Sequence, residues 1–177
     1  MLPHIGWANA VPDSNAEVNM YINGTALSFN GYGYHDKNWG DIPFTEATSS
    51  WYWGHGRLGP YSIVWFDALD WSGNEYVSGY VTKGSTVLEA SCTSGAVTVR
   101  PYGANSAYPP IAGTNPPTGY DINFNLGSAG TFNVTSVVAG VQILVPNYGR
   151  YIGPISGTIG GVNYTGTALY EEFKFKS

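Results

Sequence analysis

Alternation of apolar and polar side chains gives the clearest local signal near the start of the chain. Within residues 17–34, Val18, Met20 and Ile22 alternate with polar neighbours, as the two faces of a β-strand require. Asn23-Gly24 follows directly, and this pair favours a two-residue hairpin turn because both residues tolerate positive φ. The pattern predicts a β-hairpin.

Shorter runs of the same kind continue along the chain between clusters of turn-forming residues. They predict strands at residues 31–39, 50–57, 61–69, 75–82, 86–92, 96–102, 120–126, 131–138, 141–145 and 163–176. Residues 1–16 are interrupted by proline and glycine and are interpreted as a linker. Residues 103–119 hold four prolines and predict a long loop or lid. Since no helical apolar period exceeds about two turns, we expect an all-β antiparallel barrel or sandwich of eight or more strands.

Composition agrees with a turn-rich β protein and narrows the classes of function. The 177 residues suffice for one domain with its own core. Aromatic residues make up 15% and charged residues 11% of the chain, with 24 glycines, which is the opposite of a disordered composition. The net charge of −5 and the lack of a basic cluster argue against nucleic acid as a partner. No apolar run is long enough to span a bilayer.

Two features concern the cellular compartment. Cys92 is the only cysteine, so an intrachain disulfide is excluded, and its position in an expected strand without a neighbouring histidine favours inert burial. Sequons for N-glycosylation begin at Asn23, Asn133 and Asn163. Chance explains each sequon taken alone, whereas three together are consistent with passage through a secretory compartment. The localisation stays open.

Side chains able to carry chemistry concentrate in residues 31–71. This window holds five of the six tryptophans, two of the three histidines and seven of the nineteen charged residues. Alternation places certain side chains on a common face of each expected strand. These sets are His35, Lys37 and Trp39 in the first strand, Trp51, Trp53, His55 and Arg57 in the second, and Tyr61, Ile63, Trp65 and Asp67 in the third. We expect these three sets to share one side of the sheet and to line a pocket for a large, unsaturated, mostly apolar molecule.

Two plainer interpretations stand beside this one. Tryptophan-rich strands are more often core, and Arg57 paired with Asp67 or Asp36 is more often a buried ion pair than a catalytic device. Other chemistries lack their residues: His35 and His55 show no recognised metal-ligand spacing, no Gly-x-Ser-x-Gly elbow is present, and Gly31-x-Gly33 lacks the third glycine of a nucleotide loop. Neither a metal nor a cofactor is expected.

The motifs in the window resemble a known superfamily. Gly-Tyr-His-Asp-Lys-Asn-Trp-Gly at 33–40, Trp-Tyr-Trp-Gly-His-Gly-Arg at 51–57 and the strand at 61–67 resemble the lipocalin-like proteins that include bacterial carotenoid 1,2-hydratases and fungal cofactor-free Diels–Alderases. The segment Gly-Trp-Ala-Asn-Ala-Val-Pro-Asp at 6–13 is most similar to fungal hetero-Diels–Alderases of tropolonic sesquiterpenoid biosynthesis. The resemblance implies two β domains. Residues 17–177 would be the C-terminal lipocalin-like barrel, and residues 1–16 a linker from a missing N-terminal β domain.

The resemblance also implies roles for individual residues. The expected reaction is an intermolecular hetero-Diels–Alder cycloaddition between a terpene alkene and a quinone-methide-type heterodiene, without a cofactor. Arg57 or Lys37 would donate to the heterodiene carbonyl, and Asp67 or His35 would assist loss of water from a precursor. The residues expected to hold the shape of the substrates are Trp39, Trp51, Trp53, Tyr61 and Trp65.

The hydratase branch uses a histidine, a tryptophan and an aspartate, which align with Lys37, Trp39 and Asp67. The lysine weakens a hydratase interpretation, because it does not shuttle protons near neutral pH unless its pKa falls greatly. Two alternatives therefore remain: a non-catalytic lipocalin-like carrier of a hydrophobic metabolite, and a terpenoid hydratase or isomerase.

Overall fold

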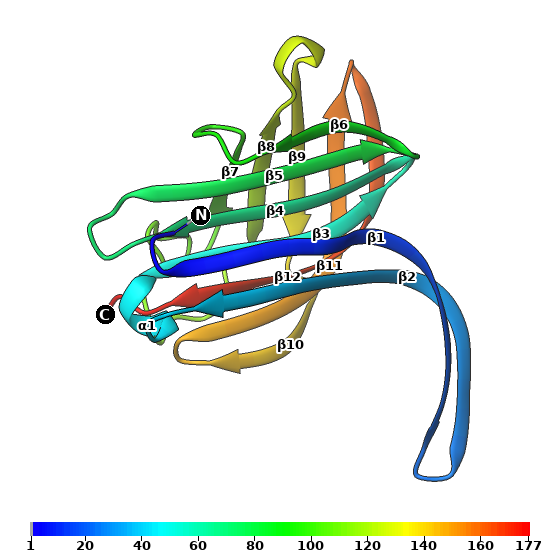
Figure 1. Ribbon diagram of the computed structural model, residues 1–177, viewed down its shortest axis with the longest axis horizontal. Coiled ribbons are helices and arrows are strands. Elements are labelled where there is room, and N and C mark those ends of the chain that lie inside the picture. Colours follow the sequence, from blue (N-terminus) through cyan, green and yellow to red (C-terminus); the bar gives the residue numbers. More distant parts are fainter. Residues whose placement is uncertain (1) are drawn as a thin grey trace.

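A long hairpin opens the chain in the computed structural model, which describes residues 2–177 (Figure 1). Strands β1 (Ile5–Ile22) and β2 (Thr25–Gly40) pair antiparallel, with Ile22 opposite Thr25. At the tip, Asn23 has φ 50° and Gly24 has φ 80°, as a two-residue turn of this kind requires. The hairpin predicted around Asn23-Gly24 is confirmed.

The hairpin is longer than the sequence indicated. Residues 5–16, interpreted as a linker, form the first part of β1, and residues 31–39 continue β2 instead of starting a new strand. The register shifts twice, between Ala8 and Val11 and between Val11 and Ser14. Pro12 falls inside the second irregularity, where no ladder partner needs its missing N–H group. The prolines and glycines that suggested a linker therefore bend a strand.

The remaining strands form one antiparallel sheet of ten. They are β3 (Ser50–Leu58), β4 (Tyr61–Leu69), β5 (Glu75–Lys83), β6 (Thr86–Ser91), β7 (Val97–Tyr102), β8 (Gly119–Asn125), β9 (Thr131–Val137), β10 (Gly140–Val145), β11 (Tyr148–Ile159) and β12 (Val162–Lys174). The spatial order is β6-β5-β4-β3-β12-β11-β9-β8-β7, and β10 pairs with β11. Only α1 (Phe44–Ala47) and the 3-10 turn η1 (Gly127–Ala129) are helical among residues 2–177. The predicted all-β antiparallel fold is confirmed.

This sheet curls on itself into a half-barrel. Strand β7 contacts β4 and β5, and β7–β9 run behind them at a steep angle (Figure 1). The main core lies between β3–β5 and β7–β9, and its largest fully buried members include Trp65, Phe124, Phe132, Tyr151 and Tyr170. Burial of such aromatic side chains supplies most of the driving force for folding.

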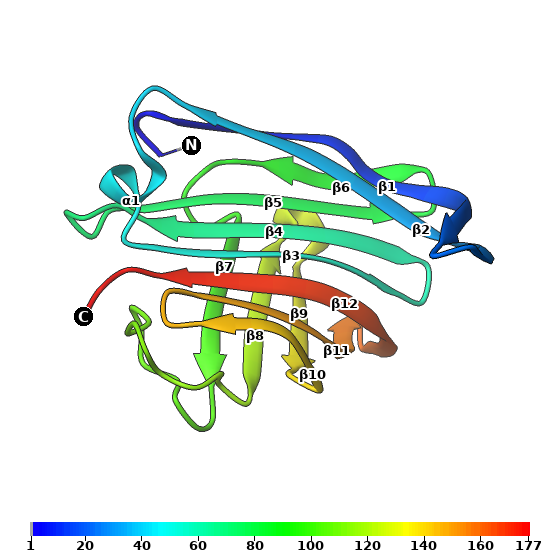
Figure 2. The same cartoon turned by 90° about the horizontal axis from the view of Figure 1, so that it is seen from below.

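A second core lies on the outer face of the same sheet, where the inner half of the hairpin covers β3 and β4 (Figure 2). The Trp7 ring of β1 stacks on Phe66 of β4 with centroids 5.2 Å apart. Every residue of β4 is consequently buried, because its two faces pack against different layers. The outer half of the hairpin projects beyond the sheet (Figure 1).

Strand β11 is the one strand of the sheet that the sequence pattern missed. It contains Gly149, Gly153, Pro154 and Gly157, residues that normally mark turns. Pro154 is tolerated because pairing with β9 starts only at Ile155, so no ladder bond on that side is lost. These glycines have close neighbours in the folded protein. In the sequence, however, they and Pro154 resemble the residues of a loop, so alternation did not indicate a strand.

The predicted loop at 103–119 is confirmed for 103–118 and closes one end of the half-barrel. The amide of Ala112 donates to the carbonyl of Lys176 (2.8 Å), and that of Gly113 to the carbonyl of Pro146 (2.7 Å). The buried Nζ of Lys174 donates to the carbonyl of Thr114 (2.9 Å). These bonds fasten the loop to the end of β12.

Two sequence expectations concern the surface. Cys92 is exposed just after the edge strand β6, so the expectation of burial was wrong; an edge strand has no neighbour to cover its end. The three sequon asparagines, Asn23, Asn133 and Asn163, are exposed. Whether they carry glycans stays a prediction. Within residues 2–177, no helix has the length and apolarity to cross a membrane.

Candidate active site

The strand register divides the predicted site between two faces of the sheet. Gly54 of β3 pairs with Trp65 of β4, and Tyr52 pairs with Asp67. Cross-strand partners lie on the same face, so Trp65, Asp67 and Tyr61 point into the half-barrel. Trp51, Trp53, His55 and Arg57 have the opposite parity and point outward. The expectation that all these side chains share one side was therefore wrong.

Gly54 and Trp65 show the physical reason. The indole of Trp65 lies directly over Gly54, within 2.1 Å of where a Cβ would stand. Glycines on β3 thus make room for large residues of β4, so the large residues of these two strands lie on opposite faces. Tyr61 and Trp65 are buried core residues, and neither lines one of the cavities described below.

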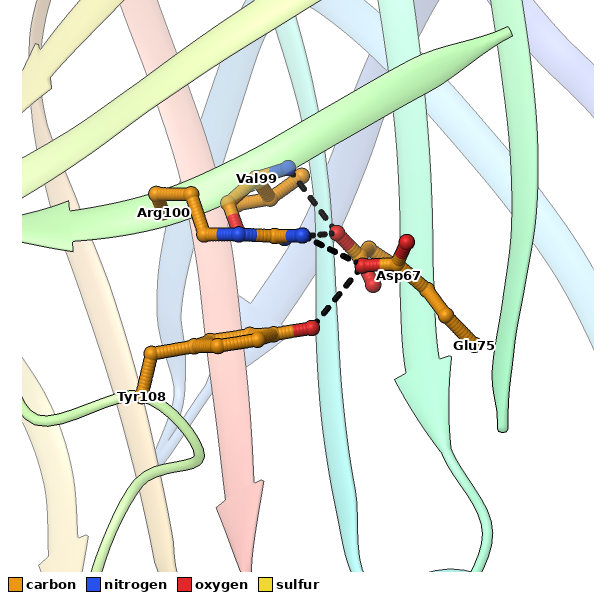
Figure 3. A network of polar contacts seen from close by, with 5 residues as sticks. All are labelled: Asp67, Glu75, Val99, Arg100 and Tyr108. Carbon is orange, nitrogen blue, oxygen red and sulfur yellow. Dashed lines mark hydrogen bonds and ion pairs between the residues drawn. The ribbon is translucent and has the colours of Figure 1, made fainter. Parts of the chain in front are cut away.

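Inside the half-barrel, Asp67 belongs to a network of polar contacts at the end closed by the loop (Figure 3). Its Oδ2 accepts hydrogen bonds from the amide of Val99 and from Nη1 of Arg100, both at 2.9 Å. Arg100 also donates to Glu75 (2.6 Å), as does the hydroxyl of Tyr108 (2.8 Å). Asp67 therefore pairs with Arg100 and not with Arg57.

Burial raises the pKa of Asp67 from its usual 3.8 to about 7, and the nearby Glu75 charge adds to this, while Val99 and Arg100 oppose it. The pKa of Glu75 is lowered by hydrogen bonds from Tyr108, Arg100 and Asp67. Of the two carboxyl groups, Asp67 thus holds the proton. Asp67 does not line either of the cavities described below.

This pKa predicts how stability depends on pH. Because the pKa of Asp67 is higher in the folded than in the unfolded chain, its contribution is fully present below about pH 4 and is lost as the pH rises through about 7. Asp67→Asn mimics the protonated acid and lacks this loss. Between about pH 4 and 8, the free energy of unfolding of the wild type should fall relative to that of Asp67→Asn by about 2–4 kcal/mol. Urea unfolding at several pH values measures it; parallel curves would contradict the assignment.

On the outer face, a cavity of about 680 Å³ lies between the hairpin and strands β3, β11 and β12. Its lining includes Tyr32 of β2, His55 and Arg57 of β3, Ile152 and Pro154 of β11, and Leu169 of β12. Most of the lining is aliphatic or glycine, so the polar atoms of His55 and Arg57 stand out. The volume lies in the range of small-molecule sites. We refer to it as the larger cavity.

Arg57 is fixed in this wall by the hairpin. Asp13 of β1 accepts from Nε (2.8 Å) and from Nη2 of Arg57, a two-point pair that orients the guanidinium. The ring of Tyr32 lies 3.6 Å from Cζ of Arg57, close enough for a cation–π contact. The hydrogen bonds that Arg57 donates to Asp13 raise the pKa of Arg57, so its positive charge is permanent.

His55 shares the same carboxylate. Its Nε2 lies 3.5 Å from Oδ1 of Asp13. The imidazole ring stacks on the ring of Tyr34, with centroids 5.1 Å apart. Burial lowers the pKa of His55, and Asp13 only partly offsets this. The imidazole is therefore mainly neutral at pH 7 and can accept a proton.

A hydrogen-bonded set behind the cavity holds the hairpin in place. Nε1 of Trp53 donates to the hydroxyl of Tyr34 (3.1 Å), which donates to Asp36 (3.1 Å). Nε1 of Trp7 donates to the same oxygen of Asp36 (2.8 Å). Trp53 is buried beneath this set, so its predicted role changes from substrate contact to support of the strand that carries Tyr32.

Lys37 and His35 do not take part. Both are exposed on β2, where Tyr34 and Asp36 face the sheet and the intervening residues face away. Alternation predicted their common face correctly, but the choice of which face turns toward the sheet was wrong. Trp39 also lies on this strand near its end, 56% exposed.

Trp39 and Trp51 line a second cavity of about 500 Å³ on the same outer face, here called the aromatic cavity. Phe44 of α1 and Phe173 of β12 add to its wall, and Arg150 with Glu171 stands at its side. These two are the predicted substrate-binding tryptophans that meet a cavity. Among residues 2–177 no group of three or more His, Cys, Asp or Glu side chains could hold a metal ion.

Sequence reasoning missed Asp13, Tyr32 and Tyr34. Asp13 lies 44 residues before Arg57, outside the window where charged residues concentrate. The only signal that pointed to it was the segment at 6–13, which carried part of the family resemblance. Local alternation does not show how the two-stranded sheet packs against the face of the larger sheet.

Comparison with known proteins identifies the family. The profile described as "Diels-Alderase-like" matches residues 1–103, more than half of the chain and the whole of the hairpin, β3 and β4. The chain belongs to the Diels-Alderase-like family.

Two curated relatives match this Diels-Alderase-like chain along nearly its full length. Quinolone epoxide rearrangement protein penF of Penicillium thymicola is 42% identical over 178 residues, covering 99% of the chain and 49% of that protein. Quinolone epoxide rearrangement protein asqO of Emericella nidulans is 41% identical, covering 99% and 48%. The chain spans about half the length of these relatives.

A solved structure supports the fold. The crystal structure of CghA with Sch210972 superposes with a TM-score of 0.74 at 11% identity, covering 98% of the chain and 55% of CghA. At this identity the likeness concerns the fold alone. The family expected from the motifs is thus confirmed, while the tropolonic sesquiterpenoid branch is not shown and stays a prediction.

Proposed function

We propose that this Diels-Alderase-like chain carries the active site of a cofactor-independent enzyme that isomerises or cyclises a hydrophobic small molecule in fungal secondary metabolism. The observation that carries the proposal is the permanent cation Arg57, fixed by Asp13 in the wall of a mostly apolar cavity. A fixed donor in apolar surroundings stabilises negative charge that develops on an oxygen far better than water does. Family membership supports an enzyme of this type.

The reaction supported best is the rearrangement of an epoxide, the activity in the names of both relatives. Such a rearrangement is an isomerisation: one epoxide C–O bond breaks, a bond to the resulting electron-poor carbon forms, and no atom is gained or lost. Arg57 would donate to the epoxide oxygen as negative charge develops there. Neutral His55 would accept the proton released by the group that bonds to this carbon and transfer it to the former epoxide oxygen, so the product is an isomer.

A hetero-Diels–Alder cycloaddition is the second candidate. The aliphatic wall formed by Ile152, Pro154 and Leu169 suits an alkene, and the guanidinium of Arg57 would donate to a heterodiene carbonyl. Holding two reactants in contact removes much of the entropic cost of their encounter. In this candidate the donor is again Arg57, and neither Lys37, His35 nor Asp67 reaches the cavity. The pair predicted from sequence, a terpene alkene and a quinone methide, stays a prediction.

We also propose that a second β domain completes the full-length enzyme. The relatives are twice as long as the chain, which leaves room for another unit of this size. The outer half of the hairpin exposes Met20, Ile22, Leu27 and Phe29, which the strand register places on one face. Apolar side chains exposed together in this way are typical of an interface.

Product analysis tests the proposed function. The chain is incubated with a quinolone bearing an epoxide and, separately, with a polyene and a quinone-methide precursor. We expect an isomer of unchanged mass from the first, formed faster and with greater stereoselectivity than without protein. Saturable binding with a product ratio equal to that of the protein-free control would favour a carrier and contradict the enzyme proposal.

A further inference from the structure

The two cavities of the outer face are neighbours along the same strands. On β12, Leu169 lines the larger cavity, and Glu171 and Phe173 line the aromatic cavity. On β11, Ile152 and Arg150 line the larger and the aromatic cavity respectively. Residues two apart on a strand lie on the same face, so one continuous surface runs through both cavities. Leu169 and Phe173 are about 13 Å apart along it.

The two cavities differ in the chemistry of their walls. Ile152, Pro154 and Leu169 make the larger cavity aliphatic. The other is lined by Trp39, Phe44, Trp51, Tyr148 and Phe173. Aromatic walls favour stacked or edge contacts with a planar, unsaturated ring. The aromatic cavity therefore suits a flat ring system, and the larger cavity suits the part of a molecule that changes shape.

Each cavity has an arginine held by a carboxylate. In the aromatic cavity, Nη2 and Nε of Arg150 donate to Oε2 of Glu171 at 2.8 and 3.2 Å. The hydroxyl of Tyr148 donates to the same oxygen at 2.6 Å. Glu171 thereby orients the guanidinium and engages two of its three nitrogens, and Nη1 is left to donate to a ligand. The Arg150 side chain is 39% exposed, so a ligand can reach it.

We propose that the aromatic cavity is a recognition subsite for a planar bicyclic aromatic ring that carries a carbonyl oxygen. Arg150 would donate to this oxygen while Trp39 and Trp51 contact the ring. The inference rests on the proposed function in one respect: the ring is one end of the substrate whose other end reacts beside Arg57. The subsite binds and orients, and the reaction takes place in the larger cavity.

Fragment binding tests the subsite without turnover. The probes are 2-quinolone, a flat bicycle with a carbonyl, and naphthalene, a bicycle of similar size without one. Binding to the ¹⁵N-labelled chain is followed by NMR. We expect 2-quinolone to shift the indole N–H signals of Trp39 and Trp51 in a saturable way and to bind more tightly than naphthalene. Absence of saturable binding, or shifts confined to the indole of Trp53 and amides around Arg57, would overturn the proposal.

Three variants separate the contributions. Arg150→Met removes the donor, and the dissociation constant of 2-quinolone should rise about 10- to 100-fold while that of naphthalene stays within about twofold. Trp39→Ala truncates an exposed ring and should weaken both probes by a similar factor. Arg57→Met is the matched control for a lost arginine and should leave both within about twofold. Equal effects of Arg150→Met on the two probes would overturn the role of Arg150.

Failure of the subsite is distinguishable from failure of the proposed function. In turnover of a quinolone epoxide, Arg150→Met should raise KM about tenfold or more with kcat nearly unchanged, because it removes binding shared by the ground and transition states. Normal turnover with no change in KM would overturn the subsite alone. Fragment binding as expected without any turnover would contradict the function and leave the subsite standing.

Discussion

Arg57→Met should lower kcat/KM for the proposed rearrangement by about 10²- to 10³-fold. The reason is the loss of a fixed, charged donor at the oxygen where negative charge develops, an effect of this size when one donor of an oxyanion hole is removed. Methionine keeps an apolar stem of similar length, so the packing on Tyr32 is largely preserved. Initial rates measured against substrate concentration give the parameter.

Two further variants define what the arginine contributes. Arg57→Lys keeps the charge but cannot form the two-point pair with Asp13, so we expect partial activity. Asp13→Asn keeps Arg57 but weakens its orientation, and activity should fall by less than in Arg57→Met. Unchanged kcat/KM in a folded Arg57→Met protein would remove Arg57 from the mechanism. Circular dichroism and the urea midpoint establish that each variant is folded.

Gly54→Ala should destabilise the fold by about 2–4 kcal/mol. A Cβ at this position would lie 2.1 Å from Cζ2 of Trp65, and the indole is 1% exposed, so it has no free space into which to move. Overpacking of a filled core forces off-rotamer side chains and backbone shifts with costs of this order. Urea unfolding followed by tryptophan fluorescence measures the change.

A second substitution shows whether the indole is the cause. Trp65→Phe removes the atoms nearest the added methyl, so the double variant should be less destabilised than the sum of the two single changes. Gly31→Ala is the matched control, because its Cβ would meet nothing closer than 3.8 Å; its effect should stay within about 1 kcal/mol. A strictly additive double variant would contradict the proposed clash.

Local pattern predicted the strands well and their arrangement poorly. Strands β3 and β4 begin and end within one residue of the ranges expected, because both combine apolar runs with clear turn residues at their ends. β11 was missed, since its glycines and Pro154 fit a tightly packed strand and also a loop. The extent of β1 was missed because Pro12 sits in an irregular part of the ladder.

Part of the cavity lining was predicted. Arg57, Trp39 and Trp51 were named from sequence and line cavities, and their roles toward a substrate stay predictions. Parity along each strand was correct, but parity does not state which faces of adjacent strands coincide; the pairing of Gly54 with Trp65 decides that. Asp13 could not be found from composition, because its contact with Arg57 depends on how one sheet lies on another.

The cavities of the outer face are built from two parts of the fold. Their floor comes from β3, β11 and β12, whose opposite side is the interior core, while their cover comes from the hairpin, which is joined to the large sheet by residues 41–49. Exchange of the hairpin should therefore change which molecules the outer-face cavities bind and leave the interior core intact. Chimaeras joined within residues 41–49 would exchange the cover alone and test this separation.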